Sequence, residues 1–185
     1  MSNSSGPILI GIGGNLPGPF GPPRATLGAA LETLESLGAR VVDRSPWYES
    51  APVPVSDQPW FVNGVVQLET SLEPPALLAA MLAAEQELGR LRGAANAART
   101  VDLDLLDYAG RITGKEDPDP ILPHPRIAER AFVVLPLKDL MPDWRHPVTG
   151  VSIAEMAAAL PADQQIGKMP DADGLWGTEW QGEGA

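Results

Sequence analysis

The sequence predicts an α+β fold: a ferredoxin-like βαββαβ core, in which an antiparallel sheet is covered by helices, followed by a C-terminal extension. Two observations predict it. Segments typical of strands and helices follow one another as strand, helix, strand, strand, helix, strand. The helical segments carry apolar residues three and four positions apart, whereas the strand segments are short apolar runs or alternate with polar residues. A length of 185 residues suits one domain over 1–160. The polar tail over 161–185 is expected to be loosely ordered.

The expected elements follow from local pattern. Proline opens the clearest helix, and Gly38 stands just beyond the first helix, where a C-terminal glycine belongs. In chain order we expect a strand over 7–14, a helix over 27–37, a strand over 39–50 interrupted at Pro46, a strand over 60–70, a helix over 74–90 and a strand over 100–108. Beyond them, residues 127–136 are expected to be helical up to Pro136, and residues 152–160 to form another short helix.

Composition restricts the class of function. A net charge of −11 and a pI of about 4.5 argue against a nucleic-acid partner, because phosphate binding needs a basic surface. A small anionic ligand stays possible where arginines or metal ions are placed locally. No apolar run is long enough for a membrane span, and the N-terminus lacks the basic region of a signal peptide. The absence of cysteine excludes disulfides and thiolate metal sites, which suits a cytoplasmic protein.

Two aspartates two positions apart in "RTVDLDLLDY" are the first candidates for chemistry. Because side chains alternate along a strand, Asp102 and Asp104 share one face, opposite Leu103. Two carboxylates this close repel each other unless a cation compensates or one is protonated. Mg²⁺ is the economical cation, since it binds one or two carboxylates together with phosphates and water. The alternative is an ordinary solvated face of a half-exposed sheet.

Arginines flank the same region. Arg90 and Arg92 end the second helix, Arg99 precedes the strand, and "GAANAA" between them is a small-residue segment that suits a mobile loop. A metal-loaded acid pair with arginines beside it is typical of phosphoryl transfer, because guanidinium groups bind phosphate oxygens bidentately. The alternative is that these are surface arginines.

Four further residues have both a functional and a structural interpretation. Phe61 and Asn63 share a strand face and could stack on and hydrogen-bond a flat heterocycle, or could be ordinary strand residues. Glu85, at the margin of an apolar helix stripe, could orient an arginine or a ligand, or could be a solvated helix edge. His124, in a proline-fixed loop near Arg130, could contact phosphate or be structural.

Taken together, the motifs resemble those of a known family. "GGNL", "WYES", "DQPWFVNGVV", "ELGRLR", "RTVDLDLL" and "LPHPRIAERAFVVLPL" occur in the order and spacing of 6-hydroxymethyl-7,8-dihydropterin pyrophosphokinases, over residues 7–160. The resemblance implies transfer of pyrophosphate from ATP to the pterin hydroxymethyl group, releasing AMP, in folate biosynthesis. The enzyme it implies is an ATP-binding transferase that uses two Mg²⁺ ions and works as a monomer.

The resemblance also implies roles for individual residues. It assigns Asp102 and Asp104 to the metal ions, and Asp102 also to activation of the attacking hydroxyl. The pterin would be held by Ser50 to Val53 of the "SAPV" loop together with Phe61, Asn63 and Phe132. The ATP site would be lined by Glu85, Arg90, Arg92, Arg99, His124 and Arg130.

The chain departs from the family pattern just before the aspartates. The family usually has arginine and tryptophan followed by glycine-proline-arginine, whereas this chain reads "ANAAR" and keeps only Arg99. We therefore expect activity with a closed state that is weaker or differently built. Two other functions stay open at this point: a D-x-D metal-dependent nucleotidyl- or glycosyltransferase, and a non-catalytic ferredoxin-like module that binds pterin or nucleotide.

Overall fold

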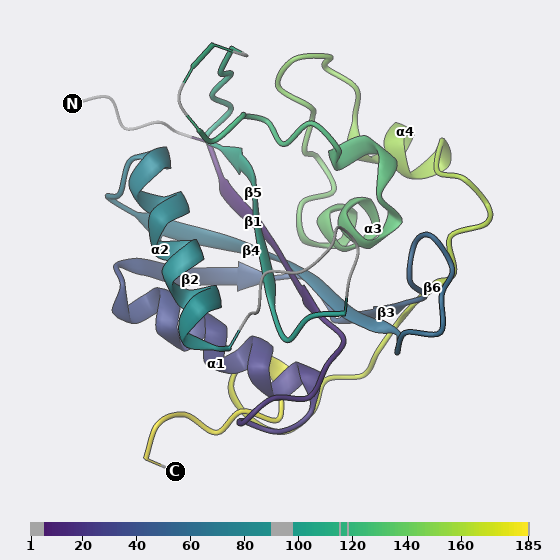
Figure 1. Ribbon diagram of the computed structural model, residues 1–185. Coiled ribbons are helices and arrows are strands. Elements are labelled where there is room, and N and C mark those ends of the chain that lie inside the picture. The colour runs from purple at the N-terminus through teal and green to yellow at the C-terminus, as the bar shows by residue number, and fades with distance from the viewer. Residues whose placement is uncertain (1–5, 90–97, 115, 118, 185) are drawn as a thin grey trace.

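Within the residues that the structure describes, six strands form one antiparallel sheet (Figure 1). The structure is a computed structural model that describes residues 6–89, 98–114, 116, 117 and 119–184. The strands are β1 (Ile8–Gly14), β2 (Ala39–Arg44), β3 (Tyr48–Ser50), β4 (Phe61–Thr70), β5 (Asp102–Tyr108) and β6 (Ile166–Lys168). Their order is β5–β1–β4–β3–β6, and β2 also pairs with β4. The sheet therefore has β5, which carries both aspartates, at one edge.

The second predicted strand is divided into two short ones. β2 pairs with the far part of β4, up to Thr70, whereas β3 pairs with its beginning, Ser50 opposite Phe61 and Tyr48 opposite Asn63. Pro46 lies between the two strands and has no N–H to give to the ladder, so the pairing is interrupted there. The consequence for the site is that β3 brings its end next to the start of β4.

Two helices cover one face of this sheet, as the ferredoxin-like order predicts. α1 (Pro23–Ser36) and α2 (Pro74–Glu87) pack with Ile10, Ile12, Leu103 and Leu105 in one buried cluster. Each helix has proline in its first turn and ends close to a glycine with positive φ, which matches the boundary signals in the sequence. The predicted fold class is confirmed. No helix in the described part of the chain combines the length and the hydropathy that a membrane crossing requires.

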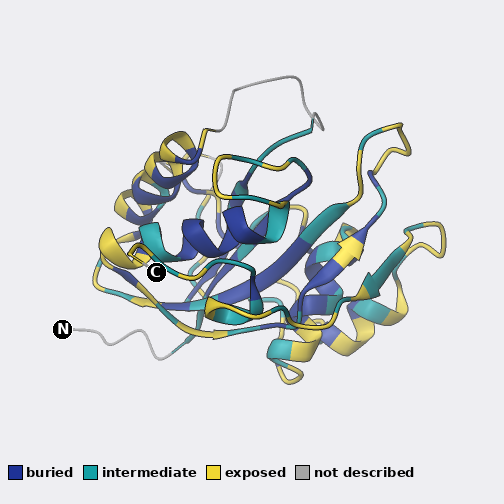
Figure 2. Cartoon of the chain, turned by 90° about the horizontal axis from the view of Figure 1, so that it is seen from below, coloured by how far each residue is buried: buried dark blue, intermediate teal, exposed yellow. Residues whose placement is uncertain are grey.

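The opposite face of the sheet is covered only in part. The turn η1 (Ile127–Glu129) and the helices α3 (Ala131–Leu140) and α4 (Ile153–Ala158) form a second cluster with Leu9, Val65 and Leu106. Figure 1 shows α3 and α4 across the sheet from α1 and α2. Figure 2 shows that the central strands are mostly buried and that the helices expose their outer sides. The remainder of the second face is where the candidate site lies.

The expectation of a helix over 127–136 is wrong in its boundaries. The chain makes a short 3₁₀ turn, is extended at Arg130, and then forms α3, which passes through Pro136 and ends at Leu140. A proline inside a helix removes one backbone hydrogen bond. Here Leu137, directly after it, is completely buried, so packing against the sheet offsets that loss. The predicted helix over 152–160 is present as α4, which begins with a capping box between Ser152 and Glu155.

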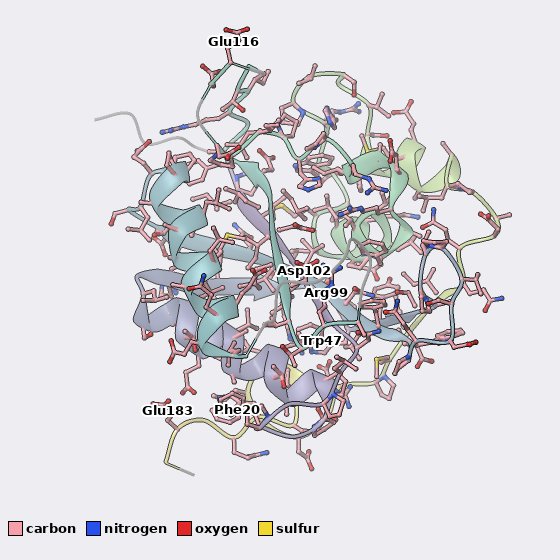
Figure 3. The ribbon with its side chains drawn as sticks, in the orientation of Figure 1. Phe20, Trp47, Arg99, Asp102, Glu116 and Glu183 are labelled. Atoms are coloured by element: carbon pink, nitrogen blue, oxygen red, sulfur yellow. The ribbon has the colours of Figure 1, made fainter. Side chains whose placement is uncertain are left out.

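The C-terminal residues are attached to the body of the molecule, in contrast with the loose order expected from their polarity. β6 pairs with β3. The indole Nε1 of buried Trp47 donates to the carbonyl of Trp176 at 2.9 Å. Trp180 lies edge-on to Phe20, 5.2 Å between ring centroids, and donates to Glu32 at 2.7 Å. Figure 3 shows Phe20 beside this segment. Two tryptophans and one short strand are thus enough to hold a segment whose overall composition is polar.

A polar cluster ties α3 to the two strands at this side of the sheet. The Tyr48 hydroxyl of β3 donates to Asp139 Oδ2, and Lys168 Nζ of β6 lies 2.9 Å from the same oxygen. Burial alone would raise the pKa of Asp139. The hydrogen bonds from Tyr48 and Lys168 outweigh burial and hold that pKa below its ordinary value of 3.8. The carboxylate form of Asp139 therefore stabilises the folded state.

This cluster predicts an acid-dependent part of the stability. A lowered folded-state pKa contributes stability that is present above the unfolded-state value of about 3.9 and is lost as the pH falls through the folded-state value. Asp139→Asn should therefore lower the urea midpoint at about pH 7, and the difference from wild type should shrink by about pH 3. The matched control is Asp143→Asn, an exposed acid just beyond α3. A difference that is the same at both pH values would contradict this role of Asp139.

Candidate active site

A pocket opens on the sheet face that α3 leaves uncovered. The space between its walls amounts to about 740 Å³, a volume that includes open solvent at its mouth. Residues of β1 and β4, with the alternate residues Asp102 and Asp104 of β5, form its floor, and the end of β3 and the start of α3 form its walls. Among its lining residues are Ser50, Val53, Phe61, Asn63, Arg99, Asp102, Asp104, Arg130 and Phe132. The structure thus brings together residues that the sequence analysis singled out far apart in the chain.

The acid pair faces this pocket, and each acid has an arginine beside it. Arg99 Nη1 lies 2.8 Å from Asp102 Oδ2, and Arg130 Nη1 lies 3.3 Å from Asp104 Oδ2. Figure 3 shows Arg99 and Asp102 next to each other at the start of β5. The two aspartate side chains keep 27% and 32% of their surface exposed. A ligand or an ion in the pocket can therefore reach both carboxylates.

His124 lies next to Asp104 but is not among the residues that line the pocket. Its backbone N–H donates to the carbonyl of Leu106 on β5 at 2.8 Å, and its Nε2 is 4.0 Å from Asp104 Oδ1. Burial lowers the pKa of His124 below its ordinary value of 6.5; Asp104 opposes this, and Arg130 adds to it. The ring is therefore mainly neutral at about pH 7. Its Nδ1 accepts from the N–H of Arg126 at 3.1 Å, so the neutral ring carries its hydrogen on Nε2, on the side of Asp104.

Glu85 is placed differently from the other candidates. Its side chain is buried, with 2% of the residue exposed, and its Oε1 accepts from the N–H of Leu103 at 2.7 Å. The interpretation of Glu85 as a solvated helix edge is therefore wrong. Glu85 is not among the residues that line the pocket, and what it holds is the backbone of β5 between the two aspartates.

The other end of the pocket offers aromatic rings and a fixed amide. Asn63 Nδ2 donates to Ser50 Oγ at 2.7 Å, and a Cβ added at Gly13 would lie 2.6 Å from Asn63 Oδ1. Glycine at position 13 is thus required for the amide to lie over β1. Phe61 and Phe132 are half-buried, and the guanidinium of Arg130 lies over the Phe132 ring at 5.5 Å. This part of the pocket suits a flat ligand with hydrogen-bonding edges.

Asn15 is a supporting residue to which the sequence analysis assigned no role, although it belongs to the quoted "GGNL" motif. It is buried, and it holds the backbone of Arg99 from both sides. Its Oδ1 accepts from the N–H of Arg99 at 2.9 Å, and its own N–H donates to the carbonyl of Arg99 at 2.9 Å. Its Nδ2 donates to the carbonyl of Pro59 at 2.9 Å. The position of Arg99 is therefore fixed against the start of β4.

The preceding glycine makes this arrangement possible. A Cβ at Gly14 would lie only 2.3 Å from the carbonyl oxygen of Thr100, so no other residue allows the chain to cross here.

Two other candidates, Arg90 and Arg92, lie outside the described residues, as does most of the "GAANAA" segment. Their predicted roles stay predictions.

The residues present fit a magnesium site that is completed by a ligand. Among the described residues, no group of three or more His, Asp or Glu side chains gathers as a complete metal cage. Asp102 and Asp104 nevertheless present carboxylate oxygens to one pocket, and oxygen is the ligand that Mg²⁺ prefers. Because Mg²⁺ commonly takes one or two carboxylates and fills its other positions with water and phosphate, two acids are enough.

The fold and the pocket are those of one class of transferase. The chain belongs to the 7,8-dihydro-6-hydroxymethylpterin-pyrophosphokinase (HPPK) family, whose model matches residues 9–142. This range contains β1 from its second residue, β2 to β5, α1, α2 and α3, and every residue named above as a lining residue of the pocket.

Named relatives agree with the family. The chain is 40% identical, over 166 residues, to the 2-amino-4-hydroxy-6-hydroxymethyldihydropteridine pyrophosphokinase of Pseudomonas aeruginosa; the match covers 89% of this chain and 98% of that protein. It is 38% identical over 149 residues to the protein of the same name from Synechocystis, covering 80% and 73%. It is 43% identical over 125 residues to the folic acid synthesis protein fol1 of Pneumocystis carinii, covering 68% of this chain but only 17% of that much longer protein.

Solved structures share the fold at low sequence identity. The Plasmodium falciparum HPPK-DHPS triple mutant with SDX-DHP superposes with a TM-score of 0.63 at 13% identity, covering 82% of this chain and 44% of that chain. The wild-type P. falciparum HPPK-DHPS with STZ-DHP gives a TM-score of 0.62 at 14% identity, covering 85% and 44%. At these identities the similarity is one of fold alone.

Asn15 provides a test of how the pocket is supported. Asn15→Ala removes the acceptor of the Arg99 N–H and the donor to Pro59, and unsatisfied buried groups cost about 1–3 kcal/mol. We expect the free energy of unfolding, measured by urea denaturation, to fall by that amount. The control Gln181→Ala truncates an exposed tail amide and should change it by less than about 0.5 kcal/mol. If both variants changed the free energy of unfolding by the same small amount, the hydrogen bonds of Asn15 would not stabilise the fold in this way.

Proposed function

We propose that this pocket is the active site at which the chain carries out the reaction of its family. The family transfers the pyrophosphoryl group of ATP to the hydroxymethyl group of 6-hydroxymethyl-7,8-dihydropterin, in folate synthesis. In this reaction the hydroxyl oxygen bonds to the β-phosphorus, the bond between the α- and β-phosphates breaks, and AMP leaves. The observation that carries the assignment is the acid pair, Asp102 and Asp104, in one pocket with Asn63 and two phenylalanines.

The pterin is assigned to the end of the pocket formed by β3 and β4. Asn63 offers an amide whose position is fixed by Gly13 and Ser50, and Phe61 and Phe132 offer ring faces. A flat heterocycle gains affinity from stacking on such rings, and a fixed amide distinguishes its hydrogen-bonding edge. The Ser50 to Val53 segment closes this side. The pterin hydroxymethyl group then points toward the aspartates.

The triphosphate is assigned to the acidic end. Asp102 and Asp104 would hold two Mg²⁺ ions, which would supply positive charge to the phosphates and to the transition state. Arg99 and Arg130, now 2.8 and 3.3 Å from the carboxylates, serve the phosphate oxygens once ATP is bound, as does neutral His124 through its Nε2–H. Asp102 also accepts the hydrogen of the attacking hydroxyl. The family resemblance assigns Arg90 and Arg92 to the nucleotide as well, and Glu85 supports this side from beneath β5.

The chain's overall charge is consistent with this assignment. A protein with a net charge of −11 repels a triphosphate unless cations are concentrated where it binds, and the arginines and metal ions supply them. The same net charge disfavours self-association, which supports a monomer. A chain without cysteine suits a reducing compartment, and we infer that the protein works in the cytoplasm.

Product analysis tests the reaction. The protein is incubated with ATP, Mg²⁺ and 6-hydroxymethyl-7,8-dihydropterin, and we expect AMP and the pterin diphosphate in equal amounts. ADP as the nucleotide product would indicate transfer of a single phosphoryl group. Pterin binding without AMP would indicate a non-catalytic module. Nucleotide turnover without pterin binding, measured by fluorescence titration, would indicate a different D-x-D transferase.

Asp104→Ala is the variant that tests the metal site. Loss of a group that stabilises transition-state charge costs about 10²–10³-fold in turnover, and the Mg²⁺ concentration for half-maximal rate should rise. The fold should persist, because 32% of this side chain is exposed. The control is Asp43→Ala on β2, an exposed acid outside the pocket, which should keep wild-type turnover. Normal turnover and Mg²⁺ dependence in Asp104→Ala would remove this residue from the metal site.

A further inference from the structure

The two walls of the pocket come from parts of the chain that are far apart, and the segment Gln164–Lys168 contacts both. One wall is the end of β3 with the residues that follow it, and the other is the extended residue Arg130 with Phe132. Gln164–Lys168 lies beyond the range that the family model matches, residues 9–142. Its contacts are therefore additional to the matched region, and they include hydrogen bonds to backbone groups on either side of the pocket.

The side chain of Gln164 holds the backbone on both sides of Arg130. Its Oε1 accepts from the N–H of Ala131 at 2.9 Å, and its Nε2 donates to the carbonyl of Glu129 at 2.9 Å. Ala131 is the first residue of α3, and the residue before it, Arg130, makes no side-chain capping bond. The first N–H groups of a helix have no partner within the helix, so Gln164 supplies from the tail what a capping residue normally supplies.

Arg130 depends on such support because no regular element includes it. It stands between η1 and α3 with extended dihedral angles, φ −109° and ψ 109°. Its guanidinium nevertheless has to lie between Asp104, at 3.3 Å, and the Phe132 ring, at 5.5 Å. Anchoring the peptide groups before and after a residue limits the directions in which its side chain can leave the backbone.

The neighbouring residues of the same segment fix the opposite wall. The carbonyl of Gln165 accepts from the N–H of Ala51 at 3.0 Å, and Ile166 pairs with Ser50, whose Oγ binds Asn63. One short stretch of chain therefore holds both walls of the pocket in place. The distance between the Asn63 amide and the Arg130 guanidinium therefore depends on that stretch.

We propose that Gln164 is a positioning residue of the active site, which holds Arg130 and Phe132 at a fixed place opposite β3. The inference rests on the proposed function, since it gives Arg130 and Phe132 a role in binding substrates. Gln164 itself does not line the pocket and touches no substrate. It acts through the backbone of residues 129 and 131.

Two adjacent glutamines provide a matched pair of variants. Gln164→Ala removes both hydrogen bonds, whereas Gln165→Ala shortens an exposed side chain and keeps the backbone carbonyl that Ala51 uses. Because small misplacement of a charge-stabilising group is costly, we expect Gln164→Ala to lower kcat/KM for the pterin by roughly tenfold or more. Gln165→Ala should keep the wild-type value. Gln164→Glu keeps the acceptor for Ala131 but not the donor to Glu129. Its kcat/KM should therefore lie between the values of the two alanine variants.

A double-mutant cycle separates positioning from a general loss of stability. In an Arg130→Ala background, the effect of Gln164→Ala on kcat/KM should be clearly smaller than in the wild-type protein, because one of the two groups that it positions is gone. Amide hydrogen exchange at Ala131 should become several-fold faster in Gln164→Ala, with global exchange little changed. Full additivity of the two substitutions, or unchanged exchange at Ala131, would overturn the proposal.

The same measurements keep this proposal distinct from the proposed function. Absence of AMP from the wild-type protein would refute the function. Wild-type turnover in Arg130→Ala would refute the assignment of Arg130 to the site. Impaired turnover in Arg130→Ala together with normal turnover in Gln164→Ala would leave the function in place and refute only the positioning role of Gln164.

Discussion

Mutual repulsion between two carboxylates is the constraint on which the architecture of this site depends. Asp102 and Asp104 are two residues apart on one face of a strand, in a protein that already carries a net charge of −11. Such a pair is stable as two anions only where positive charge is held nearby. Arg99 and Arg130 provide it, and neither lies within a strand or helix. The structure therefore has to fix two loop residues with the precision of a sheet.

The way in which it does so is the same for both arginines. The backbone of Arg99 is held by the buried side chain of Asn15, and the backbone next to Arg130 is held by Gln164. The Asn15 carboxamide accepts from the N–H of Arg99 itself, and the Gln164 carboxamide bonds one backbone group on either side of Arg130. An amide suits this use, because it both donates and accepts and carries no charge that would compete with the aspartates.

The sequence was informative wherever local periodicity decides the structure. Strand alternation correctly placed Asp102 and Asp104 on one face and Leu103 in the helix-covered core, and the element order predicted the ferredoxin-like fold. Local pattern failed where burial by distant segments decides. Pro136 argued for a helix end, but the apolar residues after it pack on the sheet and α3 continues.

Contacts between distant residues account for the rest. Asn15 and Arg99 are 84 positions apart, and nothing in "GGNL" indicates which backbone its amide will meet. The tail is polar in overall composition, yet it contains Trp176 and Trp180, which pack against the core cluster around α1. Glu85 looked like the margin of a helix stripe, yet α2 lies so close to β5 that the carboxylate is buried against the strand backbone. Arg90 and Arg92 lie outside the described residues, so their predicted roles depend on the sequence alone.

The place of β5 at the border of the sheet has one more consequence. A border strand offers outward-facing N–H and C=O groups to any strand of another molecule, and proteins avoid aggregation by occupying them. Here the N–H of Leu103 is taken by Glu85 and the carbonyl of Leu106 by the backbone of His124. The groups that hold the backbone of β5 thus also shield it from strand addition, so that this edge of the molecule stays free for small ligands.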